Sequence, residues 1–348
     1  METSSDNSST SRTAPVREKT EAHGLFNLKQ KFQNKGFSDE TVKVMCAGWA
    51  ESTHKQYNSY FKKWLNFCEE RNCNSVESDL KTIIDFLTYL HSQGYSYSGI
   101  NTAKSALISL VTVNNSSSWS SDPDLNRFIK GIYNIKPPRP KYISTWDVDI
   151  VLKFLSNWIP LSELTLKELT LKAVTLVALV SGNRAQSIHQ MKLNLFHETQ
   201  KQMSFYFDCK LKTSKPNKKA QKLILNSFED SALCVVQTLQ EYLRVTKDLR
   251  KDNQLWISWK KPHDPVGRQT ISRWLKQTLL LSGIDTSEFT GHSTRMAATS
   301  KAHAMGVGLS TILNTAGWAS QHNFIKFYCR EKLNNDQDFA KAVLDISK

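Results

Sequence analysis

Four polar side chains in the C-terminal half of the sequence are of types that could do chemistry, and they stand in a suggestive order. Arg184 follows a Gly-Asn turn, and His292 and Arg295 stand three residues apart in Gly-His-Ser-Thr-Arg, at the start of a predicted helix. Residues at that spacing share one helical face. Tyr328 comes 33 residues after Arg295. Arginine forks match phosphate oxygens and stay charged, and a tyrosine oxygen can attack phosphorus, so side chains of these types could act on a phosphate if the fold brings them together.

Two further residues extend this set. Lys212 lies in the stretch Cys209–Lys222, which contains six lysines and no acidic residue, and a mobile ammonium there can act as a general acid. Trp318 follows Ala-Gly and offers an indole N–H donor and a packing face. Taken alone, each candidate also has an ordinary structural interpretation. The arginine can end a helix, the lysine can belong to a solvated loop, the histidine can begin a helix, and the aromatic residues can pack in a core.

The order Arg…Lys…His-x-x-Arg…Trp…Tyr resembles the tyrosine recombinase, or phage integrase, family. The resemblance covers about residues 40–345. Carried over by position, it implies these catalytic residues: Arg184, Lys212 (or Lys210), His292, Arg295, Trp318 and the nucleophile Tyr328. Two positions depart from the family pattern, since Ser187 stands where many members carry an acid and Met296 where many carry histidine. These departures concern the groups that support Arg184 and His292.

The residues of two motifs resemble one subgroup of the family in particular. Asn-Arg-Ala-Gln-Ser-Ile-His, which contains Arg184, and Gly-His-Ser-Thr-Arg are similar to the recombinases of eukaryotic mobile elements of the DIRS, Ngaro and Crypton type, or to host genes derived from them. This similarity implies a nuclear location. The basic stretch Lys215–Lys222 agrees with a nuclear signal and equally with a catalytic hairpin alone.

The resemblance implies a specific chemistry. The tyrosine oxygen attacks the scissile phosphorus, forms a 3′-phosphotyrosine and frees a 5′-hydroxyl, so the phosphodiester energy is kept and no ATP is needed. No metal or other cofactor is expected, and the sequence has no carboxylate cluster of the two-metal nuclease type. The expected partner is double-stranded DNA, bound by a homotetramer on two DNA sites, with no small-molecule substrate. The expected function is site-specific recombination or integration of a mobile element.

Two alternative functions remain open at this level. One is a non-catalytic DNA-binding protein descended from a recombinase, although the presence of Arg184, His292, Arg295 and Tyr328 weighs against it. The other is a type IB topoisomerase, which shares the Arg, Lys, His and Tyr chemistry. The small size of the chain and its short C-terminal helix favour a recombinase.

The N-terminal third predicts an arm followed by a helical domain. Residues 1–37 are expected to be a disordered arm, because Met1–Gly24 holds nine Ser or Thr. Residues 38–135 show four amphipathic helices, which the resemblance identifies with a SAM-like core-binding domain that clamps DNA. Asp79 and Asp122-Pro123 are expected to begin two of them, Ser98 precedes another, and Thr53 with Gln56 predicts a capping box for the first, which spans Tyr57–Cys68.

A linker and a second domain follow. Residues 136–141, Lys-Pro-Pro-Arg-Pro-Lys, predict an extended basic linker. The catalytic domain, 142–348, is expected to be mostly α with a small β-hairpin, formed by Met203–Phe207 and Leu223–Leu225 around the basic turn. The expected helices are 148–158, 164–181 (ended by Gly182-Asn183), 231–247, 268–281, 293–304, 309–317 and 336–346. The last either docks into a neighbouring protomer or packs in cis.

Composition agrees with this interpretation. The 348 residues include 46 Lys or Arg and 32 Asp or Glu, a net charge of +14 that favours an anionic partner such as nucleic acid. The candidate DNA contacts are Asn101, Lys104, Lys136, Arg139, Lys141, Lys210, Arg273 and Lys276. Six sparse cysteines without a CxxC pair favour a reducing, intracellular compartment. The most apolar stretch, Ala173–Val180, is far shorter than a membrane span, so a soluble protein is expected.

Overall fold

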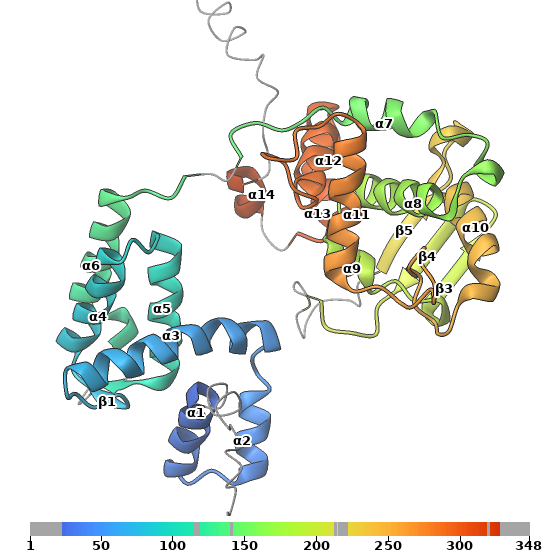
Figure 1. The fold of residues 1–348 in the computed structure, drawn as a ribbon. Helices are drawn as coiled ribbons and strands as arrows, with labels where there is room; N and C mark the ends of the chain where they lie inside the picture. The colour runs from blue at the N-terminus through green and yellow to red at the C-terminus, as the bar shows by residue number, and fades with distance from the viewer. Residues whose placement is uncertain are drawn as a thin grey trace, which may run out of the picture. The chain divides into compact units, whose positions relative to one another are not determined.

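The chain divides into two units, Met1–Arg139 and Pro140–Lys348, each with its own hydrophobic core (Figure 1). A computed structural model describes residues 23–113, 119–139, 142–211, 214, 222–318 and 321–327. Both described units are mainly helical, as expected. None of their helices is long and apolar enough to cross a membrane.

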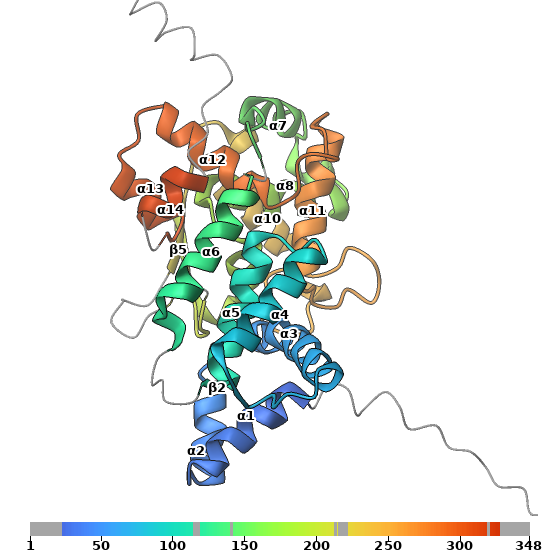
Figure 2. The ribbon, with the colours of Figure 1, turned by 90° about the vertical axis from the view of Figure 1, so that its left-hand side faces the viewer.

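The N-terminal unit is built from six described helices. They are α1 (His23–Asn34), α2 (Asp39–Cys46), α3 (Glu51–Glu70), α4 (Leu80–Ser92), α5 (Tyr97–Leu110) and α6 (Pro123–Ile135). Strand β1 (Glu77–Ser78) pairs in parallel with β2 (Thr112–Val113), so the segment before α4 is hydrogen-bonded to the segment after α5. Helices α4, α5 and α6 lie beside one another (Figure 2), and their apolar stripes enclose Trp64, Phe86 and Leu107. Burial of these stripes stabilises the unit.

Some helices begin at the residues that the sequence predicts, and others do not. The Asp79 carboxylate accepts from the Thr82 amide at 2.7 Å and begins α4, and Asp122 with Pro123 begins α6, as predicted. The predicted capping box is wrong, because α3 begins at Glu51 and Thr53 lies inside it. The N-cap of helix α5 is Ser96, two residues before Ser98, which was expected to precede the helix.

The expected disordered arm is partly a helix. Residues 23–34 form α1, which packs against α3 and α5, so the prediction for 1–37 is wrong over this range. The Lys31 ammonium donates to the Ser109 carbonyl at 3.2 Å. The apolar residues of a small separate cluster explain the helix: Leu28, Phe32, Val42, Cys46 and Trp49. The Ser- and Thr-rich composition ends before them, at about Gly24.

The C-terminal unit is organised around one buried helix. Helix α8 (Leu166–Ser181) is buried without interruption from Leu169 to Leu179, and α10, α11, α12 and β5 all contact it (Figure 1). A helix that is apolar on every side belongs in a core. The other described helices are α7 (Val148–Ser156), α9 (Ala185–His189), α10 (Val235–Thr246), α11 (Arg268–Leu281), α12 (Ser293–Ala304), α13 (Leu309–Thr315) and α14 (Gln321–Phe327).

A small antiparallel sheet covers one side of α8. Its order is β3 (Phe196–Thr199), β4 (Gln202–Tyr206), β5 (Lys222–Asn226). Met203 pairs with Leu225, and both side chains are buried in the core. The sequence predicted β4 and β5 but not β3, whose side chains are half-buried or exposed and therefore show no apolar run. Most of the basic turn between β4 and β5 lies outside the described residues.

The remaining helices compare closely with their predicted ranges. Helices α11 and α12 have the predicted bounds, while α10 begins later and α13 ends earlier than expected. Helix α14 was not predicted. The predicted helix over 336–346 lies outside the described residues.

Candidate active site

Arg184 is placed by the turn that ends α8. Gly182 is the C-cap of α8 and has a φ of 58°, a conformation that glycine adopts without strain. A Cβ there would lie 3.1 Å from both the Ala316 Cβ and the Thr299 Cγ2. The chain then becomes extended at Arg184, which is the N-cap of α9 and is half-buried. The tight turn therefore carries Arg184 out of the core beside the end of α13.

Arg295 is buried where two helices end. It lies on α12, its side chain is 2% exposed, and its Nη1 donates to the carbonyls of Gly182 and Ala316, each at 2.5 Å. These two residues are the C-caps of α8 and α13. The last carbonyls of a helix carry partial negative charge, so the site stabilises a cation. These two hydrogen bonds therefore hold the guanidinium in place between the ends of α8 and α13.

Trp318 lies against both arginines. It follows Gly317, which has a φ of 66°, and is 9% exposed. Its ring centroid is 3.9 Å from the Arg295 Cζ and 5.5 Å from the Arg184 Cζ, which is cation–π range. The structure therefore brings together three predicted site residues from α12, the α8–α9 turn and the chain after α13. Trp318 also packs in the small core around Ile312, as its ordinary interpretation expected.

A direct bond joins the two glycine turns. The Asn183 side-chain amide donates to the Thr315 carbonyl and to the Ser181 carbonyl, each at 3.4 Å. In the sequence, Gly182-Asn183 and Ala316-Gly317 stand out only as neighbours of site residues. The carbonyls of Gly182 and Ala316, which accept from Arg295, are parts of the candidate site that were not predicted. The signal available was the pair of Gly-containing turns, each directly before a candidate residue.

His292 is presented on the surface by buried neighbours. It is the N-cap of α12 and its side chain is exposed, one helical turn before the buried Arg295. The preceding Gly291 lies so close to α11 that a Cβ would come within 2.4 Å of the Ser272 carbonyl oxygen. Glycine is therefore required at this position. The two departures from the family pattern, Ser187 and Met296, are both buried.

Two predicted residues of the site, Tyr328 and Lys212, lie outside the described residues. The described chain leads up to Tyr328 through α14, which ends at Phe327. Phe324 on α14 is fully buried and meets the Trp318 ring edge-on, with centroids 5.8 Å apart. Lys210, the alternative general acid, is exposed after β4. Helix α14 is thus anchored on the residue that contacts both arginines.

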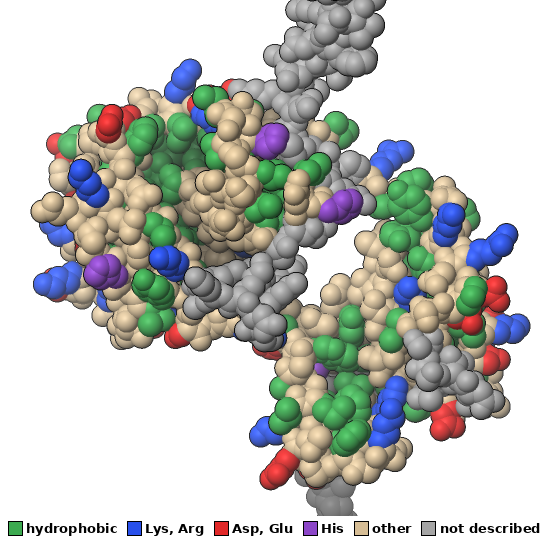
Figure 3. Space-filling view, turned by 180° about the vertical axis from the view of Figure 1, so that it is seen from behind, with side chains coloured by type: hydrophobic (Ala, Val, Ile, Leu, Met, Phe, Trp, Pro, Cys, Tyr) green, Lys and Arg blue, Asp and Glu red, His purple; other side chains and the backbone are tan. Residues whose placement is uncertain are grey.

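The candidate DNA contacts lie in both units. Asn101 and Lys104 are half-buried on α5, and Arg273 and Lys276 are exposed on α11. Lys136 and Arg139 are exposed after α6, and Lys141 lies outside the described residues. Figure 3 shows Lys and Arg side chains on the surface of each unit. Such cations suit phosphate contacts.

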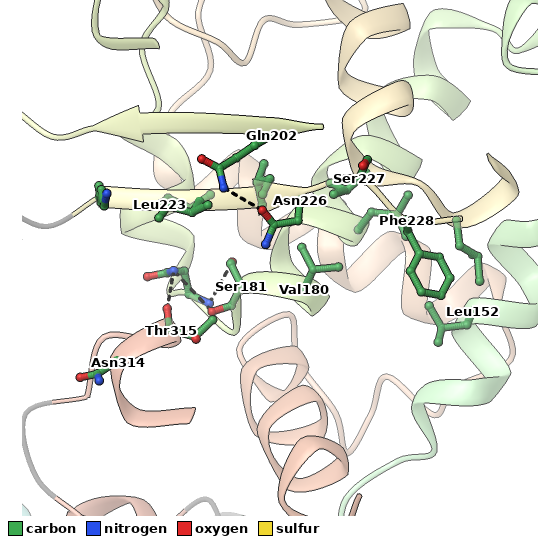
Figure 4. A pocket seen from close by; sticks show the side chains of 17 residues that line it. Leu152, Val180, Ser181, Gln202, Leu223, Asn226, Ser227, Phe228, Asn314 and Thr315 are labelled. Atoms are coloured by element: carbon green, nitrogen blue, oxygen red, sulfur yellow. Dashed lines mark hydrogen bonds between the residues drawn. The ribbon is translucent and has the colours of Figure 1, made fainter. Parts of the chain in front are cut away.

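One cavity lies beside the arginines without including them. It measures about 820 Å³ and is lined by the end of α8, strand β5 and the end of α13 (Figure 4). Gln202 donates to the Asn226 side chain at 2.9 Å across its rim, and Val180 and Phe228 line its apolar part. The arginines lie beside this cavity, Arg295 buried and Arg184 half-buried. No three His, Cys, Asp or Glu side chains gather as a metal site among the described residues.

Burial lowers the pKa of one lysine on α8, the helix whose end lines this cavity. Lys172 on α8 is completely buried, and its ammonium donates to the Trp158 carbonyl at 2.6 Å. Burial lowers its pKa from 10.5 to about 8, and the charge of Asp230 opposes this effect. Burial also lowers the pKa of His189 at the end of α9, with the Val266 backbone opposing and Arg268 adding to the effect.

Comparison with known families gives one match. The sequence profile of the phage integrase family matches residues 152–334, more than half of the chain. The matched range begins within α7 and includes every candidate catalytic position. No curated protein sequence matches the chain.

Solved structures with a similar fold are recombinases. The XerH site-specific recombinase, bound to a palindromic difH substrate in a post-cleavage complex, has a TM-score of 0.61 at 15% identity, over 94% of this chain and 89% of that one. The Tn1549 transposon integrase, in complex with transposon right-end DNA, has a TM-score of 0.55 at 13% identity, over 93% and 99%. A lambda integrase dimer bound to a COC' core site scores 0.50 at 14% identity, over 90% and 77%. At these identities the likeness establishes the fold, mostly helical with a small antiparallel sheet.

Proposed function

This chain belongs to the phage integrase family, and from that premise we propose that it cleaves and rejoins DNA through a 3′-phosphotyrosine intermediate. Enzymes of this family, the tyrosine recombinases, break and rejoin DNA. The observation that carries the proposal is the placement of Arg295, fixed between the carbonyls of Gly182 and Ala316 and covered by Trp318. A buried cation held this way, beside Arg184, is preorganised for one anionic group.

The two arginines would bind the scissile phosphate. During attack, negative charge accumulates on the non-bridging oxygens, and a guanidinium fork can donate to them in pairs. Because Nη1 of Arg295 is already fixed by two carbonyls, little reorganisation is needed when the charge develops. Trp318 would keep both guanidinium groups in register through its ring face.

The remaining roles concern protons and the nucleophile. Tyr328 would attack the phosphorus atom, forming the P–O bond to tyrosine while the bond to the 5′-oxygen breaks. Lys212, or Lys210, would give a proton to that leaving oxygen. His292, exposed at the start of α12, would donate to the phosphate oxygens or assist loss of the tyrosine proton. Reversal of these steps with a new 5′-hydroxyl rejoins the strand without ATP.

The wider assignment rests on the resemblance and on charge. We propose double-stranded DNA as the partner, with a homotetramer acting on two sites in the recombination or integration of a mobile element. The net charge of +14 and the exposed cations on α11 support DNA binding. The similarity to recombinases of eukaryotic mobile elements supports a nuclear location. XerH, the Tn1549 integrase and lambda integrase all have DNA-bound structures, which agrees with this partner.

A trapping experiment tests the proposal. The full chain is incubated with nicked suicide duplexes that carry the terminal repeats of the element, and denaturing gels are examined for a covalent protein–DNA band. We expect the band with the wild type and its loss with Tyr328→Phe. Tyr206→Phe, which removes an exposed hydroxyl near the hairpin, is the matched control and should retain the band.

The other outcomes identify the alternatives. A band that survives Tyr328→Phe would reject this nucleophile. Relaxation of supercoiled plasmid without any paired duplexes would support a topoisomerase instead. Salt-sensitive binding with no covalent band on any site would support a DNA-binding protein that has lost catalysis.

A further inference from the structure

The first described residues of the C-terminal unit pack against the turn that carries His292. Tyr142 is 7% exposed, and its ring stacks on Phe289 with centroids 5.7 Å apart. Its hydroxyl lies 2.9 Å from the Thr290 hydroxyl. This segment, Tyr142–Trp146, is called the strap here because it crosses the residues on both sides of His292. It directly follows the expected basic linker 136–141.

A second bond ties the strap to the far side of His292. The buried indole of Trp146 donates to the Ser293 hydroxyl at 2.9 Å, and that hydroxyl donates to the Thr290 carbonyl at 2.7 Å. Ser293 is fully buried. The strap therefore holds Thr290 and Ser293, which flank His292, through a connected set of three hydrogen bonds. Buried bonds of this kind fix a single geometry because leaving one unmade is costly.

The same turn is confined from the opposite side. Gly291 contacts the α11 backbone so closely that no side chain fits. Farther along α12, Lys301 forms an ion pair with Asp149, which begins the helix that follows the strap. The backbone of His292 is thus held between α11 and the strap, while its side chain stays exposed. The position of the His292 backbone sets the region that its imidazole can reach.

We propose that the strap residues Tyr142 and Trp146 are positioning residues for His292 in the DNA cleavage reaction. This inference rests on the proposed function, and it adds two residues outside the family's catalytic set. The strap would set where the imidazole meets the phosphate or the nucleophile, at a point directly joined to the linker. A small displacement of a catalytic group slows a reaction strongly even when binding is unchanged.

The position of His292 can be measured without any activity. The full-length protein, labelled at histidine, is studied by nuclear magnetic resonance, and the His292 signals are assigned with His292→Gln. We expect Tyr142→Phe, which removes one hydroxyl, and Trp146→Phe, which removes one indole donor, to shift the His292 ring signals. The signals of His54 and His91 in the N-terminal unit should stay in place. Trp64→Phe, which loses an indole bond to the Ser75 carbonyl, is the matched control and should leave His292 unchanged.

A rate measurement then separates positioning from general destabilisation. In single-turnover cleavage, each strap variant should slow the reaction roughly ten- to a hundredfold while DNA affinity stays within about twofold. In a His292→Ala background, the same strap substitution should have no further effect. Additive losses in the double variants, or unmoved His292 signals in both single variants, would overturn the proposal. A wild type that never cleaves would reject the proposed function and still leave the resonance test decisive for the strap.

Discussion

At the scale of single residues, the central feature is a buried arginine that donates to backbone carbonyls at the ends of two helices. Arg295 donates to the C-cap carbonyls of Gly182 and Ala316, and the Trp318 ring covers its face. Carbonyl groups stabilise the cation without cancelling its charge as a carboxylate would. These carbonyl contacts therefore leave the positive charge of the arginine available to a phosphate.

Substitution of Arg295 by lysine tests this arrangement. A lysine keeps the charge but loses the planar fork, so it cannot bind both carbonyls and a phosphate in the same geometry. We expect Arg295→Lys to lower the single-turnover cleavage rate by roughly 10²–10³-fold, the usual effect of losing a preorganised donor. Arg244→Lys, at an exposed arginine paired with Glu241, is the control and should cleave normally. Cleavage by Arg295→Lys at the wild-type rate would contradict the account.

Lys172 gives a pH prediction of its own. Its folded pKa, about 8, lies below the unfolded value of 10.5, so the unfolded chain binds more protons between these values. Stability must therefore rise with pH through this window, because the cost of a buried charge disappears. Between pH 8 and 10.5, the wild type should gain about 3 kcal/mol of unfolding free energy relative to Lys172→Met.

Urea unfolding of both proteins across this pH range checks the prediction. The comparison removes the effect of other titrating groups, which both proteins share. A wild-type curve that runs parallel to that of Lys172→Met would show that Lys172 titrates normally.

At the scale of elements, two left-handed glycine turns determine where the site forms. Gly182 ends α8 and Gly317 follows α13, and their turns meet around Arg295. The two positions differ from other left-handed glycines in having atoms within 4 Å of where a Cβ would stand, and these are tight only at Gly182. Around Gly306, for example, the space for a Cβ is open.

Alanine at Gly182 and at Gly306 separates the effect of backbone strain from the effect of displacing the turn. Gly182→Ala and Gly306→Ala should each lose about 1–2 kcal/mol of stability, because alanine is strained at a positive φ. Only Gly182→Ala also meets Ala316 and Thr299 at 3.1 Å, so the turn must move its carbonyl away from Arg295. We expect cleavage to fall by about tenfold or more in that variant alone. Equal cleavage rates in the two variants, measured beside their thermal unfolding, would contradict this role.

Much of the element pattern could be predicted from local sequence signals. The bounds of α11 and α12 and the caps of α4 and α6 follow from local sequence, and they agree with the structure. Strand β3 has no apolar run and forms because β4 lies beside it. Helix α1 adjoins a Ser- and Thr-rich segment, and contacts with α2, α3 and α5 stabilise it. Such elements depend on partners distant in the sequence, which local patterns do not contain.

The site itself divides in the same way. Residue types and spacing singled out Arg184, Arg295 and Trp318, which the structure brings into contact. The backbone carbonyls that fix Arg295 could not be predicted, because they are contributed by residues 113 positions before it and 21 after it. Every residue has a backbone carbonyl, so the sequence does not indicate which carbonyls will contact a side chain. Tyr328 and Lys212 stay predictions, since they lie outside the described residues.

At the scale of the whole molecule, charge is spread over two units with separate cores. The formal charge of +14 supports phosphate contacts from both, and each contact should release about one counterion. Affinity should then depend on salt through a sum of individual lysines and arginines. Exposed cations on α11 are the clearest contributors to this sum in the described part of the C-terminal unit.

Substitution of Lys276 tests whether α11 contributes a phosphate contact. Lys276→Gln on α11 should lower the magnitude of the slope of log affinity against log salt by about 0.9, the value expected for one phosphate contact. Lys81→Gln, which removes an exposed lysine paired with Asp85, is the control and should leave the slope unchanged. Fluorescence anisotropy titrations at several salt concentrations give the slopes. An unchanged slope for Lys276→Gln would remove α11 from the DNA interface.

The central claim, that Tyr328 attacks a phosphate held by the arginines, is tested most directly by identifying the atom to which DNA becomes attached. The covalent complex from a suicide duplex is digested with nuclease and protease, and the modified peptide is sequenced by mass spectrometry. The account predicts a nucleotide 3′-phosphate on the Tyr328 oxygen and a free 5′-hydroxyl on the released strand. Attachment to any other side chain, or through a 5′-phosphate, would contradict it.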